Sequence, residues 1–466
     1  MSPLYPRAVI LLACILGAEP ALAGKKYFVR PDGDDARCDG SSAAAWSQPA
    51  RPQASPCAFR TLGRAMQKLK GGDDLQIGAG VYQERLVLPA GLAGSESDPT
   101  IIAGDPAASR RDVVIAGIPG EIDTIHSPGG MTQFLTLRHL RFRAGARFGI
   151  HLAGAHQDIT LTDLEVTPED FPASPAICCR LKGDESAALI RIRDGRLQTT
   201  RITITDSRFV GPESPGENGV PGADASTMFI QATRTRISRV ESRRFLGAFA
   251  GEISHNSIVE ECIIGETTCS DFDGCVSSYN DRDIIVRRNV FHDMAPSVVF
   301  SAIKVRRNPR QRPEAGVIAY NNTFIGLPGT RENLPEIAAN WHQPTESSGV
   351  SGHSVFINNL MIDMGNPRTN RPNYGYAVRL AHCPESLRLD HNGYWKSAAG
   401  QDFINAAECP GATWNAHSVR ADPQLDAGFM PAAGSPLCAG GDASYTAWDG
   451  DKASPWIGAR ECRAAP

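Results

Sequence analysis

The segment Val286-Arg287-Arg288-Asn289-Val290-Phe291 holds the pattern that decides the fold, because this pattern returns along the chain. A β-rich run is followed by Asn or a small polar residue, and a large apolar residue stands two places further on. The other copies lie at 137–142, 161–166, 204–209, 319–324, 357–361 and 389–394. In chain order, the last four copies are 286–291 and the three that follow it. Each has an asparagine at the same place, and these asparagines are 33, 37 and 33 residues apart: Asn289, Asn322, Asn359 and Asn392. Such steps are typical of solenoids, so the sequence predicts stacked β-coils.

The recurring asparagines have a physical role in such a stack. Asn tolerates unusual backbone angles at a corner, and identical amides in successive coils can hydrogen-bond in a ladder. The unequal steps predict that loops of different size leave one corner. A sandwich of ordinary alternating strands is the alternative, but it gives turns every ~8–12 residues without recurring Asn corners.

Composition agrees with a long β-rich chain. The 466 residues would suggest about three domains at ~150 residues each, whereas one elongated solenoid explains the length by the number of its coils. A hydrophobic content of 41% is enough for a core, which excludes a disordered chain. The 45 glycines and 33 prolines indicate many turns, and the lack of a Gly-X-Y period excludes collagen. The formal net charge of −4 gives no overall attraction to nucleic acid.

Residues 1–23 have the features of an export signal. Arg7 precedes the apolar run 8–16, and the Ala-Leu-Ala at 21–23 is a small-residue cleavage site. A lipoprotein signal at Cys14 is the less favoured alternative, because the apolar run continues past it. No later apolar stretch approaches the ~18 residues that a membrane span needs. We therefore expect a secreted or periplasmic protein with no membrane span.

Cysteine usage agrees with export. The chain has 12 cysteines, of which Cys14 belongs to the predicted signal, so an odd number remains. An oxidising compartment would pair most of them and leave at least one free thiol or intermolecular bond. Proximity in the sequence suggests three pairs: Cys38 with Cys57, Cys383 with Cys409, and Cys438 with Cys462. The absence of any Cys-x-x-Cys disfavours a zinc site.

Both ends of the chain carry short motifs. Tyr-Phe-Val-Arg-Pro-Asp-Gly-Asp-Asp at 27–35 and Gly-Ala-Gly-Val-Tyr at 78–82 stand near the beginning, and Gly-Ser-Pro-Leu-Cys at 434–438 stands near the end. Together with 59–65, 71–74, 422–425 and 457–459, they resemble the opening and the ending of secreted right-handed parallel β-helix proteins of the pectin-lyase-like superfamily. Members of this superfamily include polysaccharide lyases, uronan epimerases, polygalacturonase-type hydrolases and non-enzymatic surface proteins, so the resemblance does not decide the activity.

The resemblance implies an all-β fold: a single-stranded right-handed parallel β-helix with a short N-terminal capping helix and an irregular C-terminal cap. The expected parts are the N-terminal cap and first coils at 24–110, the β-helix at 111–400 and the C-terminal cap at 401–466. Local patterns agree, since apolar residues at helical spacing within 61–69 can cover the open first coil. We expect a monomer.

Each predicted coil contains a further strand, which precedes the loop to its Asn corner. Because strand side chains alternate, the apolar residues of these strands face the core and the residue between them faces outward. Stacking predicts one outward column: His151, Arg191, Gln231, Glu252, Ser277, Lys304, Asn340 and Arg379. A second predicted column lies two residues on: Arg193, Ser254, Tyr279, Arg306 and His342. A solvated sheet face would also be polar, which is the alternative for any single member.

Positive charge is concentrated near the middle of these columns. Residues 282–312 contain eight Lys or Arg residues against Asp283 and Asp293. A basic cleft concentrates anionic polymers, so the predicted partner is an acidic polysaccharide that contains uronic acids. Nucleic acid is not expected, because the chain is exported and has little aromatic interleaving.

The mixture of groups in the two columns suits β-elimination at a uronate. This reaction needs positive charge or a metal at the carboxylate, a base for the C5 proton and an acid for the leaving oxygen. Lys304 is the predicted base, and neighbouring arginines must lower its pKa for this role. The predicted catalytic residues are Lys304, Arg379, Arg306 and Tyr279. The predicted substrate-binding residues are Asn340, His342, Arg191, Gln231, Ser277 and His151.

The segment Ser301-Ala302-Ile303-Lys304-Val305 is similar to the strand that bears the base lysine in the alginate lyase and chondroitinase B family. That family places acidic calcium ligands shortly before the lysine, where this chain has Val298-Val299-Phe300. If calcium is used, the nearest candidate ligands are Glu252, Asp271 and Asp273. The two aspartates also fit turn positions in a loop, which is the favoured interpretation.

Three other functions remain open. The segment 271–275 loosely resembles the paired-aspartate strand of polygalacturonase-type hydrolases, but the Gly-His-Gly that those enzymes show in the following coil is missing. A uronan epimerase shares the first proton abstraction with a lyase, but the Asp-Pro-His-Asp motif of alginate epimerases is missing too. A non-catalytic glycan-binding β-helix protein is the third.

Overall fold

The computed structural model describes the part of the chain that the following ranges cover: 24–47, 55–171, 187–193, 198–213, 222–223, 225–267, 275–279, 283–294, 303–306, 317–326, 339–342, 350–364, 378–380, 384–396 and 416–464. The predicted export signal at 1–23 lies outside the described residues, as do Asp271 and Asp273. None of the described helices is long and apolar enough to cross a membrane.

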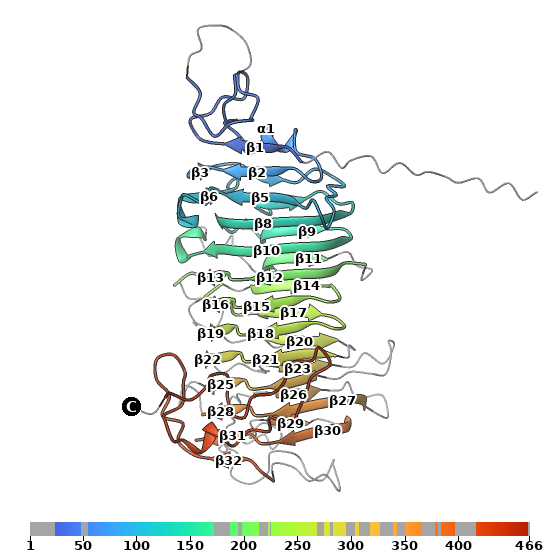
Figure 1. Ribbon diagram of the computed structural model, residues 1–466, viewed down its shortest axis with the longest axis vertical. Helices are drawn as coiled ribbons and strands as arrows, with labels where there is room; N and C mark the ends of the chain where they lie inside the picture. The colour runs from blue at the N-terminus through green and yellow to red at the C-terminus, as the bar shows by residue number, and fades with distance from the viewer. Residues whose placement is uncertain are drawn as a thin grey trace, which may run out of the picture.

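The strands pair in parallel along one long axis (Figure 1). One sheet has 22 strands and the other has ten. By their pairings, the 22 strands fall into two series, sheet 1 and sheet 2, and the ten-stranded sheet is sheet 3. β8 (Thr132–Phe142) and β10 (His156–Val166) bend from sheet 1 into sheet 2.

The other strands of sheet 1 are β1 (Lys26–Val29), β2 (Asp74–Ile77), β5 (Thr100–Gly104), β12 (Thr200–Thr205), β15 (Arg236–Ser238), β18 (Ile258–Glu260), β21 (Ile284–Arg287), β24 (Val317–Tyr320), β27 (Val350–Ile357) and β30 (Pro384–Asp390). Those of sheet 2 are β3 (Gly80–Tyr82), β6 (Val113–Ile115), β13 (Arg208–Val210), β16 (Glu241–Arg243), β19 (Ile263–Thr267), β22 (Val290–Met294), β25 (Thr323–Gly326), β28 (Leu360–Ile362), β31 (Gly393–Trp395) and β32 (Val419–Arg420).

The strands of sheet 3 are β4 (Leu86–Val87), β7 (Ile125–Ser127), β9 (Phe148–Ala153), β11 (Ala188–Arg193), β14 (Ser226–Ile230), β17 (Ala250–Ile253), β20 (Val276–Tyr279), β23 (Ile303–Arg306), β26 (Ala339–His342) and β29 (Val378–Leu380). Each coil passes through sheets 1, 2 and 3 in that order. The protein is a right-handed parallel β-helix, as predicted.

The core lies inside the three sheets and follows strand alternation. Leu135, Ile159 and Ile202 are register partners on successive strands of sheet 1, and each is fully buried. Full burial of such a side chain stabilises the fold by about 1.5–3 kcal/mol. Because every coil repeats this inward column, the core is continuous along the axis.

The predicted asparagine ladder is confirmed at the corner between sheets 1 and 2. Asn289 Nδ2 donates to Asn322 Oδ1 at 3.0 Å, Asn322 Nδ2 to Asn359 Oδ1 at 2.9 Å, and Asn359 Nδ2 to Asn392 Oδ1 at 3.3 Å. All four asparagines are fully buried. A buried amide is costly unless its hydrogen bonds are made, so the ladder removes this cost coil by coil.

One part of the corner prediction is wrong. The unusual backbone angle belongs to the residue before each ladder asparagine. The φ angles of Arg288, Asn321, Asn358 and His391 are 55°, 52°, 57° and 54°. The left-handed residue turns the chain, and the asparagine that follows can then point inward and stack.

A short helix stands at the N-terminal end, where one was predicted. α1 (Leu62–Met66) buries Leu62, Ala65 and Met66 in the main core. Thr61 Oγ1 accepts from Arg64 N at 3.1 Å, and the Glu84 carboxylate accepts from two further N–H groups of the first turn. These contacts satisfy donors that have no partner within the helix. The described residues also include three 3₁₀ turns: η1 (Arg110–Asp112), η2 (Pro168–Asp170) and η5 (Pro436–Cys438).

After β32 the chain turns back and runs along the outside of the coils, where Figure 1 shows it in red. We call residues 421–464 the C-terminal strap. Strap residues Ala447 and Ala453 pack in one cluster with outward apolar residues of sheet 1: Ile258, Ile285, Tyr320 and Ile357. A second cluster joins the strap to sheet 2: Leu360, Ile362, Leu437 and Ile457. Strands buried on both faces are apolar on both faces, which explains the unbroken run Ile284-Ile285-Val286.

The strap also carries carboxylates that meet buried groups of sheet 1. Arg287 is 3% exposed and donates from Nε to Glu260 Oε2 at 2.8 Å. Its Nη1 donates to Tyr320 Oη at 2.9 Å and to Asp449 Oδ2 at 2.8 Å. Burial raises the pKa of the Tyr320 phenol, so its hydroxyl keeps the proton that it donates to Asp451 Oδ2 at 2.8 Å. Acidic strap residues thus neutralise an arginine that the fold has buried.

Two of the predicted disulfides are confirmed, Cys38–Cys57 and Cys438–Cys462. The predicted Cys383–Cys409 pair lies outside the described residues. Cys275 is disulfide-bonded as well. Within the described part of the chain, Cys262 is a free cysteine and is buried. A free cysteine agrees with the odd number of cysteines outside the predicted signal.

Candidate functional site

Sheet 3 brings the centre of the predicted columns into register. The pairings of β20, β23, β26 and β29 align four members of the first column: Ser277, Lys304, Asn340 and Arg379. They align three members of the second: Tyr279, Arg306 and His342. Stacked strands lie about 4.8 Å apart, so neighbours in a column can contact one sugar unit. The side chains of these seven residues lie outside what the structure describes, and their roles stay predictions.

The N-terminal half of the first column is partly as predicted. His151 and Arg191 are register partners, but Arg191 then pairs with Phe229 and not with Gln231. Gln231 belongs to the second column, where its Oε1 accepts from Arg193 Nε at 2.9 Å. Phe229 and Gln231 both stand between buried residues, so alternation permits either alignment. Only the backbone ladder distinguishes two registers that differ by two residues.

The predicted place of Glu252 is also wrong in register. Ala250 pairs with Val276 and Ile253 pairs with Ser278, so two residues of β17 stand opposite one residue of β20. Such a bulge interrupts the straight column at this coil. Of the three predicted calcium ligands, Glu252 therefore lies at an irregular strand position, and the other two lie outside the described residues.

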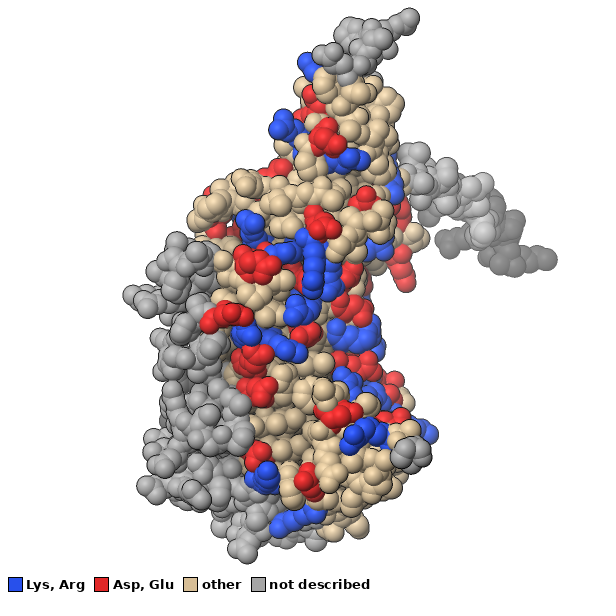
Figure 2. All heavy atoms as spheres, turned by 90° about the vertical axis from the view of Figure 1, so that its left-hand side faces the viewer, with Lys and Arg blue, Asp and Glu red and all other residues tan. Residues whose placement is uncertain are grey.

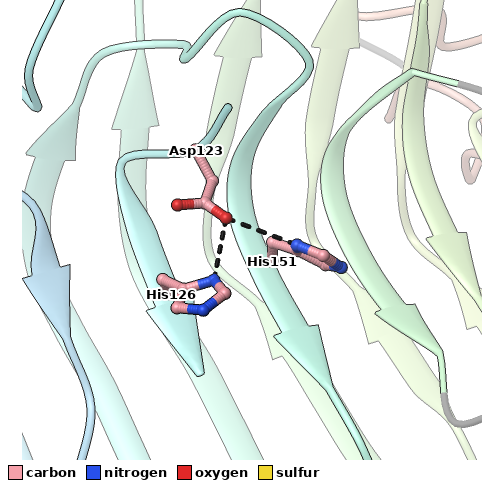
Figure 3. Close-up of side chains that lie close together, drawn as sticks. All are labelled: Asp123, His126 and His151. Carbon is pink, nitrogen blue, oxygen red and sulfur yellow. Dashed lines mark hydrogen bonds and ion pairs between the residues drawn. The ribbon is translucent and has the colours of Figure 1, made fainter. Parts of the chain in front are cut away.

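Asp123, His126 and His151 meet near the N-terminal end of sheet 3 (Figure 3). His126 on β7 and His151 on β9 are register partners, and Asp123 precedes β7. Asp123 Oδ2 lies 2.8 Å from His126 Nδ1 and 3.3 Å from His151 Nδ1. The other oxygen, Oδ1, accepts from Arg85 Nε at 3.1 Å. One buried carboxylate thus orients two imidazole rings on the outer face of the sheet.

The charge of Asp123 is maintained in spite of its burial. Burial alone would raise the pKa of this carboxyl, but hydrogen bonds from His151 and Arg85 and the electrostatic effect of His126 outweigh it and hold the pKa below its usual value. A carboxylate with its side chain only 2% exposed is therefore ionised at neutral pH. It supplies negative charge directly beside two nitrogen donors.

Arg191 is held by aromatic rings. Its guanidinium lies 5.2 Å from the centre of the Phe148 ring and 5.4 Å from that of Phe229. The Phe148 ring also lies 4.6 Å from the His151 ring. Arg191 is 4% exposed, which favours a packing role over the direct substrate contact that was predicted.

Asp123, His126 and Arg85 were not predicted as site residues. His126 had a signal, because it stands between two buried residues just as His151 does one coil later. Extending the column one coil toward the N-terminus would have found it. Asp123 and Arg85 lie outside the regular part of their strands, and no periodicity points to either.

The predicted basic cleft needs a correction. Arg287 and Arg288, two of its eight cations, belong to sheet 1 and its corner, and both pair with strap carboxylates. On the side that Figure 2 shows, Lys or Arg and Asp or Glu stand beside one another. Ion pairs in and beside sheet 2 include Arg111–Glu165, Arg141–Asp170, Arg208–Glu241 and Arg244–Glu266. Several arginines of sheets 1 and 2 are thus neutralised, and the side chains of the other six cations of 282–312 lie outside what the structure describes.

Comparison with known proteins found similar solved structures. No protein-family model and no curated protein matches the sequence. A solved alginate lyase from Paenibacillus sp. str. FPU-7 is 13% identical, with a TM-score of 0.45 over 74% of this chain and 97% of that chain. A GH136 lacto-N-biosidase from Eubacterium ramulus is 11% identical, with a TM-score of 0.43 over 85% and 68%. Pectate lyase Pel9A is 11% identical, with a TM-score of 0.42 over 95% and 98%.

The solved structures that resemble this chain thus include polysaccharide lyases and a biosidase. Identities and TM-scores of this size leave the activity to be argued from the chain's own residues.

Proposed function

We propose that this protein is an exported polysaccharide lyase that cleaves an acidic, uronic-acid-containing polysaccharide by β-elimination along sheet 3. The register of β20, β23, β26 and β29 carries the proposal. It places Lys304 between Ser277 and Asn340 on one column. Two residues on, it places Arg306 beside Tyr279 and His342. A base, positive charge and hydrogen-bonding groups within neighbouring strands are the set that the elimination needs.

In the proposed reaction, Lys304 removes the proton from C5 of the uronate. The bond between C4 and the glycosidic oxygen breaks, a C4–C5 double bond forms, and Tyr279 gives a proton to the leaving oxygen. Arg306 and Arg379 neutralise the substrate carboxylate while negative charge develops on it. Asn340 and His342 hold the sugar ring.

The C-terminal strap supports this choice of sheet. In the coils from β18 to β31, the described strap residues bury the outer sides of sheets 1 and 2. The contacts of Arg287, Asn321 and Asn358 with the strap all lie on those two sheets or their shared corner. Within the described residues, the strap's contacts thus fall on sheets 1 and 2, which supports sheet 3 as the side from which a polymer approaches.

The test follows product formation on a panel of uronate polysaccharides. A lyase produces unsaturated ends that absorb ultraviolet light together with new reducing ends, and we expect both for the wild type. Lys304→Ala should abolish the absorbance while circular dichroism stays unchanged. Lys68→Ala, an exposed lysine near α1, is the matched control and should keep wild-type rates.

Three results would contradict the proposal. Reducing ends without absorbance would mean hydrolysis, and wild-type elimination by Lys304→Ala would remove the lysine from the reaction. Binding of the polymer with neither product would favour an epimerase or a non-catalytic glycan-binding protein.

A further inference from the structure

We propose that Asp123, His126 and His151 bind one divalent transition-metal ion of the Zn²⁺ class on the outer face of sheet 3. The site is independent of the elimination chemistry proposed above. Lys304 lies five strands further along the sheet, which at ~4.8 Å per strand is about 24 Å from His151.

The distances between the donor atoms suit one ion. Ligands at about 2.0–2.1 Å from a metal lie roughly 2.8–3.4 Å apart at octahedral to tetrahedral angles. Asp123 Oδ2 lies 2.8 Å from His126 Nδ1 and 3.3 Å from His151 Nδ1. The donor atoms of the three residues all lie within 4.8 Å of one another. Only small side-chain adjustments separate this arrangement from a coordinated one.

The three residues are held in place before any ion arrives. The pairing of β7 with β9 fixes the backbones of His126 and His151 side by side. The Phe148 ring, 4.6 Å from the His151 ring, limits the rotation of that imidazole. Arg85 occupies Asp123 Oδ1 and leaves Oδ2 turned toward the two histidines. Partners that orient metal ligands in this way raise metal affinity.

The local charge favours a cation. Arg85 contributes one positive charge, whereas Asp123 and Glu121 contribute two negative charges, and Glu121 Oε2 lies 3.4 Å from Arg85 Nη1. The formal charges of Asp123, Glu121 and Arg85 sum to −1. A histidine nitrogen binds a metal ion through its lone pair, and both Nδ1 atoms face Asp123 Oδ2, where the ion would lie.

The donor set selects the class of metal. Imidazole nitrogen suits Zn²⁺, Ni²⁺, Cu²⁺ and Fe²⁺, whereas Ca²⁺ takes six to eight oxygen ligands. Three protein ligands leave at least one position open for water or another ligand. The side chains of His126 and His151 are 23% and 22% exposed, so this position can be reached from solvent.

A second cluster provides the control. Asp390, His391 and His417 also lie close together. Asp390 Oδ1, however, accepts from the backbone N–H of both His391 and His417, so this carboxylate caps a loop. His417 Nδ1 lies 2.6 Å from Asp390 Oδ2, and its ring stacks on that of His391, but its side chain is 67% exposed, whereas that of His151 is only 22% exposed.

The experiment measures metal binding directly. The full-length protein is treated with EDTA, dialysed, and titrated with Zn²⁺ by calorimetry and with Co²⁺ by visible absorption. We expect one ion per chain and a Co²⁺ spectrum of nitrogen ligation. His126→Ala and His151→Ala should each weaken binding by at least about tenfold, since even outer partners of metal ligands contribute that much. His417→Ala should bind as the wild type does.

Thermal unfolding gives an independent measurement. Zn²⁺ should raise the Tm of the wild type and leave the Tm of the folded double variant His126→Ala, His151→Ala unchanged. Failure of the wild type to bind either metal would overturn the proposal. The proposal would also be overturned if the double variant still bound the metal and His417→Ala did not. Either result leaves the elimination test on Lys304 unaffected.

Discussion

The side-chain amide of Asn322 donates to Asn359 Oδ1 at 2.9 Å, and the same contact recurs in the coils on either side. Asn359 Oδ1 also accepts from the backbone N–H of Asn322 at 3.0 Å. Each rung therefore connects two coils by side chain and backbone together. Because these amides lie inside the corner with no exposure, the ladder determines how one coil is placed on the next.

Asn322→Ala should destabilise the fold by about 3 kcal/mol or more. The change leaves Val286 O and the backbone N–H of Asn289 without their partner, and a buried unsatisfied group costs about 1–3 kcal/mol. Denaturant unfolding measures the effect. The exposed substitution Gln67→Ala should lie within about 0.5 kcal/mol of the wild type. An equally small effect for Asn322→Ala would show that the ladder contributes little.

Arg287→Met should loosen the C-terminal strap. Breaking a buried ion pair by removing one partner costs about 3–5 kcal/mol, and Arg236 beside Glu260 will reduce this to roughly 3 kcal/mol. Chemical denaturation should report the loss, and limited proteolysis should cleave the strap sooner. Arg239→Met removes an exposed pair with Asp206 and should cost about 1 kcal/mol or less. Equal effects for both variants would argue against a buried anchor.

Acid should release the strap. Burial alone would raise the pKa of Asp451, but hydrogen bonds from Tyr320 and Arg288 hold this pKa below its usual value. A carboxyl whose folded pKa is depressed contributes stability above its unfolded pKa of about 3.9 and loses it as pH falls through the folded value. Stability should therefore be constant from pH 7 to about 5 and fall below pH 4. Asp451→Asn should be less stable at pH 7 and show a shallower acid transition; an unchanged profile would contradict this assignment.

Cys262 should resist alkylation in the native protein. Burial raises the pKa of its thiol to about 12, and the thiolate is the reactive form. Mass spectrometry after iodoacetamide treatment should find Cys262 unmodified in buffer and modified in denaturant. Rapid native modification would mean that the coil around Cys262 opens readily.

Arg379→Ala should lower kcat for elimination by about 10²–10³-fold, the usual effect of removing one group that stabilises transition-state charge. Arg379 pairs in register with Asn340, and Asn340 pairs with Lys304 on the strand before it. Steady-state absorbance assays measure the change. Arg234→Ala, an exposed arginine near sheet 1, should be neutral. Equal activity of the two variants would remove Arg379 from the proposed catalytic set.

Several features were predictable from short patterns. Alternation identified the inward and outward residues of strands such as β9, and the asparagine spacing identified both the solenoid and the ladder. Proximity identified Cys38–Cys57 and Cys438–Cys462, because each pair closes a short loop at one end. These predictions succeeded because strand period, amide stacking and short loop closure are local properties.

Other features had no local pattern. Gln231 stands two residues from its predicted partner because alternation is unchanged by a shift of two. The bulge at β17 displaced Glu252, and only the pairing with β20 reveals it. The strap was expected as an irregular end cap, and its course along sheets 1 and 2 depends on contacts between residues more than 130 positions apart.

The sequence by itself determined the architecture: a repeat of strands with period two, corners marked by asparagine, and one long stack of coils. The tertiary structure decided which side chains meet. Asp123 joins His126 and His151 only because β7 and β9 pair in one register, and Arg287 meets Asp449 only because the strap folds back over it. Periodicity specifies which way a side chain points, whereas its neighbours depend on loop lengths, bulges and distant segments that no short window of sequence contains.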